Sequence, residues 1–537
     1  MALLLTRSGR VELARSFHRD IQNSNDVVYF TIGRTTQWDD EQLPEEPIDS
    51  NYYLNEFRRN IMFVQKITSA NICHLARRID WTSGTIYDPY DDSYSEDNAA
   101  ESGATNLADA NFYVLTNDFN VYKCLDNNNG AQSITKPEGT APTIIEHDGG
   151  GQDGYIWKFL FQISPADRSK FLDSNFIPIR KLTGNPTFDV NGIIDALAIT
   201  AGGSGYSTAP QVTILGDGTG AGATCTISGG AVNSITVTAA GSGYSFATVI
   251  FIGGGGSGVT ASATLGVADA LPSLQSAVES ASTTQGGAIG RIIISNGGVD
   301  YVSGDVTVVI TGDGSGATAI ATVVDGQITN IAVTNEGSGY TFADVTFQTT
   351  GSGTNAVARA VIAPIEGHGS NPIRELYANR VGIVSTLFDK DNADLTLGND
   401  FRQIGLIKNL KDYPKTSHFT ASTGNASFIV DVDTVDAGNY AVDDIILTDE
   451  AVEGKFRVIQ IINNVSSYKI HLQKIRGDIT SSSTLENETQ TLSGLSINSL
   501  TNPEFNVSSG EIVYIENRAA VNRNENQAET IKAIVTF

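Results

Sequence analysis

The first third of the chain mixes helical and extended hydrophobic patterns. Apolar side chains fall at helical spacing in residues 9–22 and again in 51–64, so both segments predict amphipathic helices. Residues 27–32 are β-branched and aromatic and predict a strand, and 112–125 predict a hairpin. The strongest core signal is 154–161, where aromatic residues alternate with apolar ones. This alternation indicates a strand buried on both faces.

Between these elements, residues 79–111 are acidic and irregular. Tyr87, Pro89, Tyr90 and Tyr94 stand among aspartates. An EF-hand calcium loop would need acids at every second position, then Gly and a closing Glu, and this segment lacks that pattern. We expect a solvated loop, with calcium binding as the lesser alternative.

Residues 187–363 have a different pattern of short strands punctuated by glycine. The only basic residues here are Arg291 and Arg359. A glycine turn followed by tyrosine recurs at nearly constant intervals, ending at Tyr206, Tyr244, Tyr301 and Tyr340. Such self-similarity predicts a duplicated unit, here two compact β modules at about 187–266 and 290–363, in which each tyrosine covers the end of a thin sheet. The joint, 267–289, predicts a short helix with Leu271, Leu274 and Val278 on one face.

After residue 363 the composition reverts to that of the beginning. Residues 382–388 and 401–407 predict strands, and two more follow near the C-terminus. We therefore expect a mainly β, multidomain chain: a β-sandwich-like body with a few helices, interrupted by small Gly-rich β repeat domains. The body comprises 1–186, 364–414 and 508–537. Residues 187–363 and 415–507 are the predicted insertions, the second a separate β domain.

Composition narrows the classes of partner. The chain has 537 residues, enough for about three or four domains, and a formal net charge of -26. This charge opposes binding to nucleic acid or anionic membranes, so neither is an expected partner. Cys73, Cys124 and Cys225 lie far apart and predict buried free thiols. The N-terminal apolar run is too short for a signal peptide, and no stretch is long enough to cross a bilayer, so we expect a soluble chain.

Motifs for chemistry are weak throughout. Residues 253–258 fit G-x-G-x-x-G, but no helix start follows, so a glycine turn is expected. The six histidines are scattered, and most of them are predicted to be surface or capping residues. Asp217 and Asp313 occupy matching Gly-Asp-Gly turns; one acid per turn favours an aspartate-stabilised turn, and cation binding stays open as the alternative. We predict no catalytic, metal or cofactor-binding residues and no cofactor.

Several segments together resemble a known family. They are residues 29–34 with Trp38, 77–81, 88–90, 121–126, 153–161, 401–404, 510–518 and 534–537. In this order they resemble the baseplate wedge protein of T4-like contractile-tailed phages, the gene eight product family. The resemblance covers 20–185, 370–412 and 508–537, but neither the repeat block nor 415–505.

The resemblance implies a β-rich, non-enzymatic structural subunit. Family members are dimeric within each wedge and pack against other wedge proteins of the baseplate, and no catalytic residues carry over. Trp38, Trp81 and Trp157 are expected in the core rather than at an interface. The implied location is the virion, in the tail baseplate, after assembly in the host cytoplasm.

Three functions follow as hypotheses. The first is a baseplate wedge subunit that holds neighbouring wedge proteins together and takes part in the rearrangement that triggers sheath contraction. The alternative is a host-surface protein that binds glycan through the Gly-Ser-Gly-Tyr repeats. A depolymerase is third, although cleavage of a glycosidic bond needs clustered carboxylates that the repeats lack.

Overall fold

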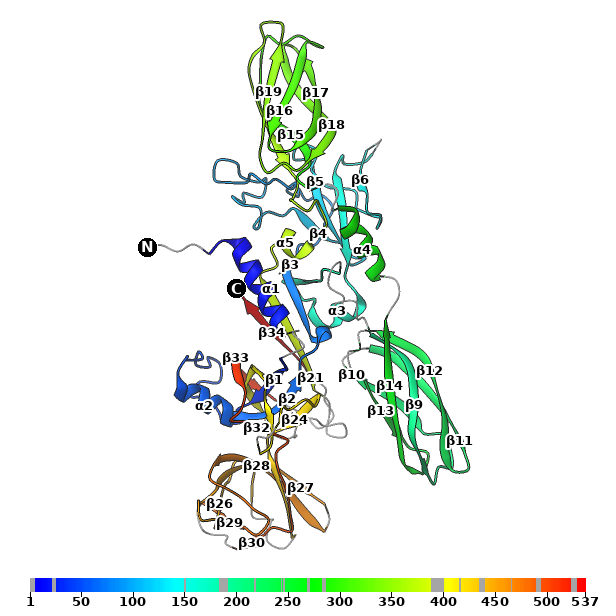
Figure 1. The fold of residues 1–537 in the computed structure, drawn as a ribbon, viewed down its shortest axis with the longest axis vertical. Helices are drawn as coiled ribbons and strands as arrows, with labels where there is room; N and C mark the ends of the chain where they lie inside the picture. The colour runs from blue at the N-terminus through cyan, green and yellow to red at the C-terminus, as the bar shows by residue number, and fades with distance from the viewer. Residues whose placement is uncertain are drawn as a thin grey trace. The chain divides into compact units, whose positions relative to one another are not determined.

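The computed structural model describes residues 5–21, 26–148, 151–182, 192–216, 219–242, 244, 247–267, 271–282, 286–387, 400–414, 417–433, 440–464, 466–488, 494–522 and 529–537. Antiparallel strands dominate these ranges, with a few short helices (Figure 1). The predicted mainly β, multidomain fold is confirmed. The chain divides into two compact units, one of Met1–Ser16, Cys73–Gly382 and Ile534–Phe537, the other of Phe17–Ile72 and Ile383–Ala533.

The centre of the second unit is a five-stranded sheet that joins distant segments. Its order is β24 (Thr423–Asn425), β2 (Ile61–Lys66), β1 (Val28–Gly33), β22 (Phe401–Lys408) and β33 (Glu511–Val521). β1 and β22 are antiparallel, with Ile32 opposite Ile404. Tyr29, Phe57 and Val64 belong to the core cluster on this sheet. Three segments of the family resemblance, from β1, β22 and β33, are thus neighbouring strands.

The second predicted helix is shorter than its hydrophobic pattern suggested. α2 (Asn51–Asn60) starts at Ser50, whose side chain accepts a hydrogen bond from the Tyr53 amide. It ends where β2 begins, so the prediction of helix through 64 is wrong for its last turn. Residues 61–64 are Ile-Met-Phe-Val and all buried. A short apolar run of this kind fits a buried strand as well as a helix, and pairing with β1 decides it.

A seven-stranded sheet forms the β domain within 415–507. Its order is β30, β29, β26, β27, β28, β25 and β31. These strands are β25 (Phe428–Asp433), β26 (Ile445–Thr448), β27 (Lys455–Asn463), β28 (Ser467–Arg476), β29 (Thr484–Asn487), β30 (Leu495–Ser496) and β31 (Ser499–Thr501). The flanking short strands pair elsewhere: β24 with β2, and β32 (Phe505–Asn506) with β23 (Lys411–Asp412). The exact limits of this domain stay a prediction.

The first unit contains the aromatic core predicted from 154–161. A four-stranded sheet has the order β4 (Tyr113–Leu115), β5 (Asn120–Asp126), β7 (Ile156–Gln162) and β6 (Ile144–Glu146). The five central residues of β7 are all buried, which confirms burial on both faces. A further four-stranded sheet, not confined to the first unit, has the order β34 (Glu529–Thr536), β21 (Arg380–Leu387), β3 (Ile72–Arg77) and β8 (Phe176–Ile179).

The remaining helical segments of the described chain are α1 (Arg7–Ile21), η1 (Ser69–Asn71), α3 (Pro165–Phe171) and α5 (Pro372–Glu375).

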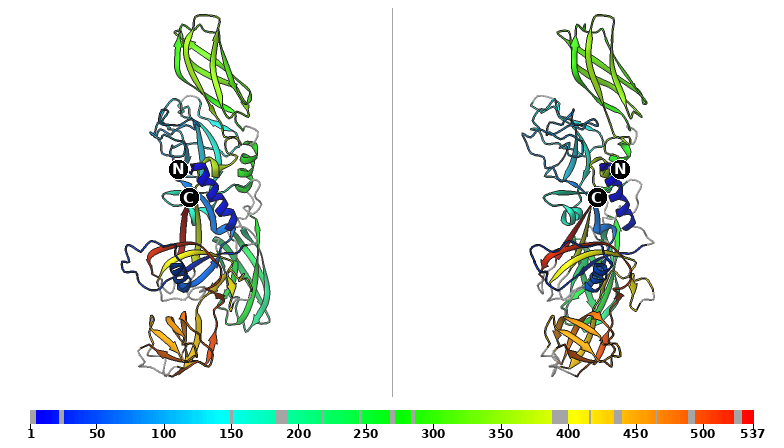
Figure 2. Two further views of the ribbon diagram at one scale, coloured as in Figure 1. Left: turned by 60° about the vertical axis from the view of Figure 1, so that its left-hand side comes forward. Right: turned by 90° about the vertical axis from the view of Figure 1, so that its left-hand side faces the viewer.

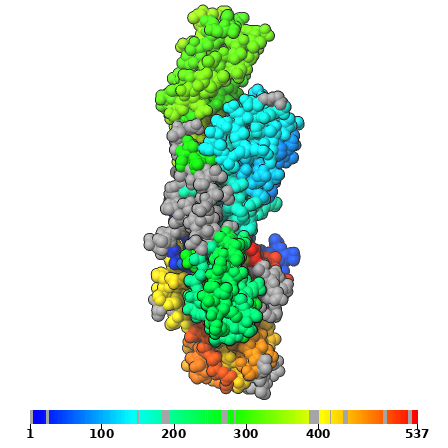
Figure 3. Space-filling view, turned by 90° about the vertical axis from the view of Figure 1, so that its right-hand side faces the viewer, coloured from blue at the N-terminus to red at the C-terminus, as the bar shows by residue number. Residues whose placement is uncertain are grey.

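The glycine-rich block folds as two similar modules (Figures 1 and 2). The first module contains β9 (Gly192–Ser204), β10 (Gln211–Gly216), β11 (Thr219–Ser228), β12 (Ala231–Ser242), β13 (Ala247–Ile252) and β14 (Ser257–Val267). The second module contains β15 (Ile289–Val299), β16 (Val306–Gly312), β17 (Ser315–Val324), β18 (Gln327–Ser338), β19 (Ala343–Thr349) and β20 (Thr354–Ile362). It forms a continuous lobe in the space-filling view (Figure 3). Between the modules lies α4 (Leu271–Ser282), which confirms the predicted helix, with Val278 fully buried.

The tyrosines explain why glycine recurs in these modules. Tyr206, Tyr244, Tyr301 and Tyr340 are all buried. A Cβ atom on Gly353 would lie 2.3 Å from the Tyr301 ring, and one on Gly314 would lie 2.4 Å from Tyr340. Each ring therefore packs directly on a glycine backbone, and any larger residue would displace it.

Candidate functional site

The acidic loop of residues 79–111 contains two buried carboxylates, those of Asp88 and Asp91. Asp88 is fully buried, and its carboxylate accepts hydrogen bonds from the Ser102 amide (2.8 Å), the Ser102 hydroxyl (2.6 Å) and the Asn111 amide (2.5 Å). Asp91 is only 2% exposed. The prediction of a solvated loop is wrong at these positions, because backbone amides, hydroxyls and an arginine replace water around the carboxylates.

The two arginines of the glycine-rich block both bind this part of the body. Arg359 on β20 pairs with Asp91, one of its two hydrogen bonds measuring 2.8 Å. Arg291 on β15 donates to Asp126 at 3.2 Å. Burial alone would raise the pKa of Asp91, but the hydrogen bonds from Arg359 and Ser93 together outweigh burial and hold that pKa below its ordinary value. The second module is therefore attached to the body through charge-assisted hydrogen bonds.

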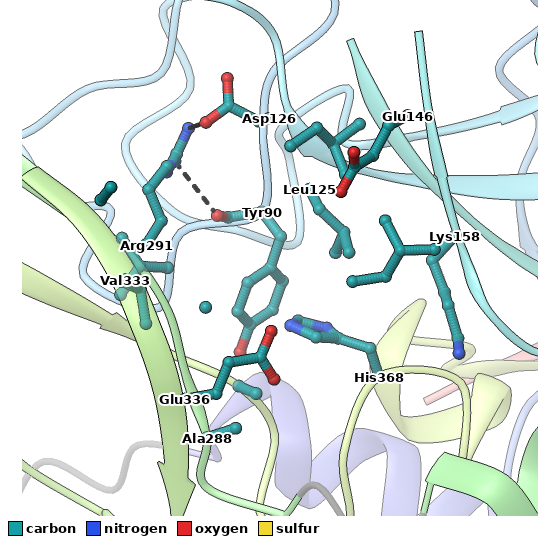
Figure 4. Close-up of a pocket in the computed structure, with 16 residues that line it drawn as sticks. Tyr90, Leu125, Asp126, Glu146, Lys158, Ala288, Arg291, Val333, Glu336 and His368 are labelled. Carbon is teal, nitrogen blue, oxygen red and sulfur yellow. Dashed lines mark hydrogen bonds and ion pairs between the residues drawn. The ribbon is translucent and has the colours of Figure 1, made fainter. Parts of the chain in front are cut away.

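A cavity of about 350 Å³ lies beside this attachment. Figure 4 shows the Tyr90 ring at its centre, between Arg291 on one side and His368 on the other. The lining also includes Lys158 and Glu336, so it carries charges of both signs. A lining of mixed sign offers no single field that would select a cation or an anion.

Tyr90 also covers a buried ion pair. Lys123 and Glu375 are 2.8 Å apart, with side chains 0% and 3% exposed. The Lys123 ammonium lies 4.0 Å from the Tyr90 ring centroid, a cation–π contact. Glu375 also accepts from the amides of Gly369 (2.8 Å) and Asn371 (3.1 Å). Burial lowers the pKa of Lys123, and Glu375 opposes that shift.

His368 completes the network around Tyr90. The two rings meet edge to face with centroids 4.8 Å apart. Burial lowers the pKa of His368 well below its ordinary value, and Lys123 and Lys158 add to the effect. This lowered pKa keeps the imidazole neutral beside the two lysines. We therefore interpret His368 as a packing residue that contacts the Tyr90 ring.

Ser133, Asp153 and His147 form another buried cluster. Asp153 accepts from the Ser133 hydroxyl at 3.3 Å and lies 2.9 Å from His147 Nδ1. In a nucleophilic triad the imidazole lies between the hydroxyl and the carboxylate, so that it can take the hydroxyl proton. Here the carboxylate lies between the other two. The cluster therefore organises the loop before β7 and does not activate the serine.

In the second unit, Trp38, Arg34 and Arg402 hold one loop in place. The Trp38 indole donates to the Arg518 carbonyl (2.8 Å), and Arg402, only 4% exposed, pairs with Glu41 at 2.7 Å. The Arg34 guanidinium lies 3.5 Å from the Trp38 ring centroid. These contacts fix the segment between β1 and α2 to the edge of the five-stranded sheet.

The prediction that Asp313 stabilises its own turn is corrected, because the carboxylate binds a second turn at Thr341 and Phe342. Its carboxylate accepts from the Thr341 amide (2.8 Å), the Thr341 hydroxyl (2.5 Å) and the Phe342 amide (3.2 Å). The hydrogen bonds from Thr341 lower the pKa of Asp313 to about 2. Asp217 lies outside the described residues. Within the described ranges, no group of three or more His, Cys, Asp or Glu is placed to hold a metal ion.

Other expectations have mixed outcomes. The G-x-G-x-x-G segment forms the turn after β13 and runs into the start of β14, and no helix follows it, as predicted. The prediction of surface histidines is wrong for His18, His74, His147 and His471, which are buried. Among the cysteines, which are all free thiols, Cys225 is only half-buried. Trp38 and Trp157 are core residues as expected, whereas Trp81 is half-buried.

Sequence reasoning missed the residues that attach the second module. Arg291 and Arg359 are the only basic residues in an acidic, glycine-rich block, and that isolation was the available signal. Lys123 stands among apolar residues in the middle of β5. A lysine in such a buried strand indicates that an acidic partner is buried with it. Glu375 gave no comparable signal.

Comparison with known proteins gives one partial similarity. No family model matches the chain. Over 188 residues the chain is 24% identical to a baseplate wedge protein, gp8, of Enterobacteria phage T4; the match covers 30% of this chain and 56% of that protein. The chain thus spans about half the length of this relative. No helix among the described residues is long and apolar enough to cross a membrane.

Proposed function

We propose that this protein is a structural subunit of a contractile phage tail baseplate. The observation that carries the proposal is the partial similarity to a baseplate wedge protein. Segments that resemble that family support it, since β1, β22 and β33 lie far apart in the sequence and form adjacent strands of one sheet. Short motifs that form one sheet support a resemblance to a family better than motifs scattered over the surface.

The finer role is to hold neighbouring wedge proteins together and to take part in the rearrangement that triggers sheath contraction. We further infer a homodimer within each wedge, assembly in the host cytoplasm and no enzymatic activity. The buried polar clusters support the last point, because their groups are engaged in holding loops and strands.

The glycan-binding alternative finds no support at its proposed residues. Protein sites for sugars present exposed aromatic faces, but the four repeat tyrosines are at most 7% exposed. Their rings cover glycines within each module. We therefore assign the modules a spacer or contact role within the particle.

The test has two parts. Quantitative mass spectrometry measures the copy number of the chain in purified particles. An adsorption assay compares normal particles with particles whose copy of this chain lacks residues 202–363. A constant copy number per particle, with adsorption unchanged by the deletion, supports the baseplate role. Absence from purified particles contradicts it, and loss of adsorption in intact particles would favour the host-surface function instead.

A further inference from the structure

The loop between β1 and α2, together with the first turn of α2, presents apolar side chains to solvent. Leu43 is 77% exposed, Ile48 60% and Tyr52 75%. All three lie within ten positions, and Figure 2 shows this segment (blue) extending away from the strands of the five-stranded sheet. Single exposed apolar residues are ordinary, but three such large ones in one short segment mark an interaction surface.

The loop is held rigidly although its tip is exposed. Trp38 and Glu41 fix its start through the Arg518 carbonyl and Arg402. The Asn517 side-chain amide donates to the Glu45 carbonyl at 2.6 Å, which fixes its middle. Ser50 then caps α2. A pre-ordered segment loses little conformational entropy on binding, so its apolar side chains contribute more of their burial energy to affinity.

The charged residues within this segment's own sequence are all acidic. Residues 39–49 contain Asp39, Asp40, Glu41, Glu45, Glu46 and Asp49. No Lys or Arg occurs between Arg34 and Arg58. Of the six carboxylates, Glu41 is turned inward to Arg402, and the others are exposed. An apolar centre with an anionic rim fits a partner that has an apolar groove bordered by lysine and arginine.

We propose that the loop of residues 39–52 docks into a basic, apolar groove on a different protein of the same assembly. This rests on the proposed function, because it takes the chain to be part of a particle. A second copy of this chain is the poorer partner: its net charge is -26, so most of its surface would repel the carboxylates. Leu43, Ile48 and Tyr52 supply the buried contacts, and the exposed acids set orientation and association rate.

The direct experiment is zero-length carboxyl-to-amine coupling in purified particles, followed by peptide mass spectrometry. We expect Asp39, Glu45, Glu46 or Asp49 to be joined to lysines of a different protein. Coupling only to lysines of this same chain, or no coupling while the chain is present in the particles, would overturn the docking proposal alone. Absence of the chain from the particles would overturn the proposed function as well.

A variant tests the apolar centre. Leu43→Ser/Ile48→Ser/Tyr52→Ser should lower incorporation into particles at least tenfold while the purified chain keeps its melting temperature. The matched control, Val442→Ser/Val452→Ser, changes residues 40% and 63% exposed in the same unit and should incorporate normally. Equal incorporation of both variants would contradict the proposal. Sedimentation of the purified chains gives a second check. A natural chain that is a dimer and a triple variant that is a monomer would also contradict the proposal, because the partner would then be a second copy.

Discussion

Arg359 and Asp91 are 268 positions apart and form an ion pair in which the carboxylate is only 2% exposed. The corresponding position in the first module lacks the arginine. Arg359 lies opposite Ile293 in the β15–β20 pair, and Ser262 lies opposite Ala198 in the matching β9–β14 pair. The two modules thus share a register, but only the second carries the residue that binds the acidic loop. The same holds for Arg291, whose counterpart is Ala196.

Arg359→Ala should loosen the second module from the body. Without the guanidinium, the buried Asp91 carboxylate keeps hydrogen bonds from the Ser93 amide and hydroxyl. We expect the free energy of unfolding to fall by about 2–3 kcal/mol. Hydrogen–deuterium exchange should become faster in residues 89–98 and in β20. The control is Arg476→Ala, which breaks an exposed pair with Glu453 and should cost less than about 1 kcal/mol. Equal effects of the two substitutions would contradict the assigned role of Arg359.

Lys123→Met should be among the most destabilising substitutions in the first unit. It leaves the Glu375 carboxylate buried without its cation, which costs about 3–5 kcal/mol. The double variant Lys123→Met/Glu375→Gln should recover part of this loss, because a neutral amide still accepts from the Gly369 and Asn371 amides. Urea unfolding of the natural chain, the single variant and the double variant measures both the loss and the recovery. A double variant no more stable than the single one would show that the charge is not the cause.

Gly353→Ala should destabilise the second module. The new methyl group would lie 2.3 Å from the Tyr301 ring, so the ring must move, at a cost of about 1–3 kcal/mol. Gly290→Ala is the matched control in the same module, since a Cβ there meets nothing within 4 Å. Its effect should stay within about 0.5 kcal/mol. Thermal unfolding of the two variants decides the matter, and indistinguishable melting temperatures would refute the ring-on-glycine explanation.

The second unit should lose stability between pH 6.5 and about 4 because of His471. Burial lowers the pKa of His471 to about 4, with a smaller contribution from Lys469. In this window the unfolded chain binds a proton that the folded chain does not, so falling pH favours unfolding, by up to about 1.4 kcal/mol per pH unit. Above pH 6.5 the contribution is fully present.

The His471→Gln variant should therefore show a shallower decline in unfolding free energy between pH 7 and pH 5. His418→Gln serves as the control because that imidazole is exposed, and its decline should match that of the natural protein. Urea titrations at several pH values give the slopes. If the His471 variant has the natural slope, another group causes the acid sensitivity.

Sequence patterns predicted the elements whose cause is local. The strands of the two modules follow from alternating side chains and glycine turns within a few residues of each other. Strand β7 is likewise predictable from its own sequence, because its aromatic and aliphatic residues already indicate burial on both faces. Such elements need no knowledge of distant partners.

The remaining features depend on partners far along the chain. Asp88 and Asp91 looked solvated because acidic loops usually are, and only the folded chain brings donors to them. The end of α2 was missed because residues 61–64 fit either a helix or a buried strand until β1 pairs with them. The buried histidines were missed for the same reason, since a lone histidine carries no local signal of burial.

The central claim, that the chain is a structural part of a tail baseplate, is tested most directly by an electron cryo-microscopy map of purified particles. The account predicts density for the five-stranded sheet and both modules within the baseplate, at constant copy number, with the loop of residues 39–52 against a different protein. Particles whose baseplate is fully accounted for by other chains would contradict it.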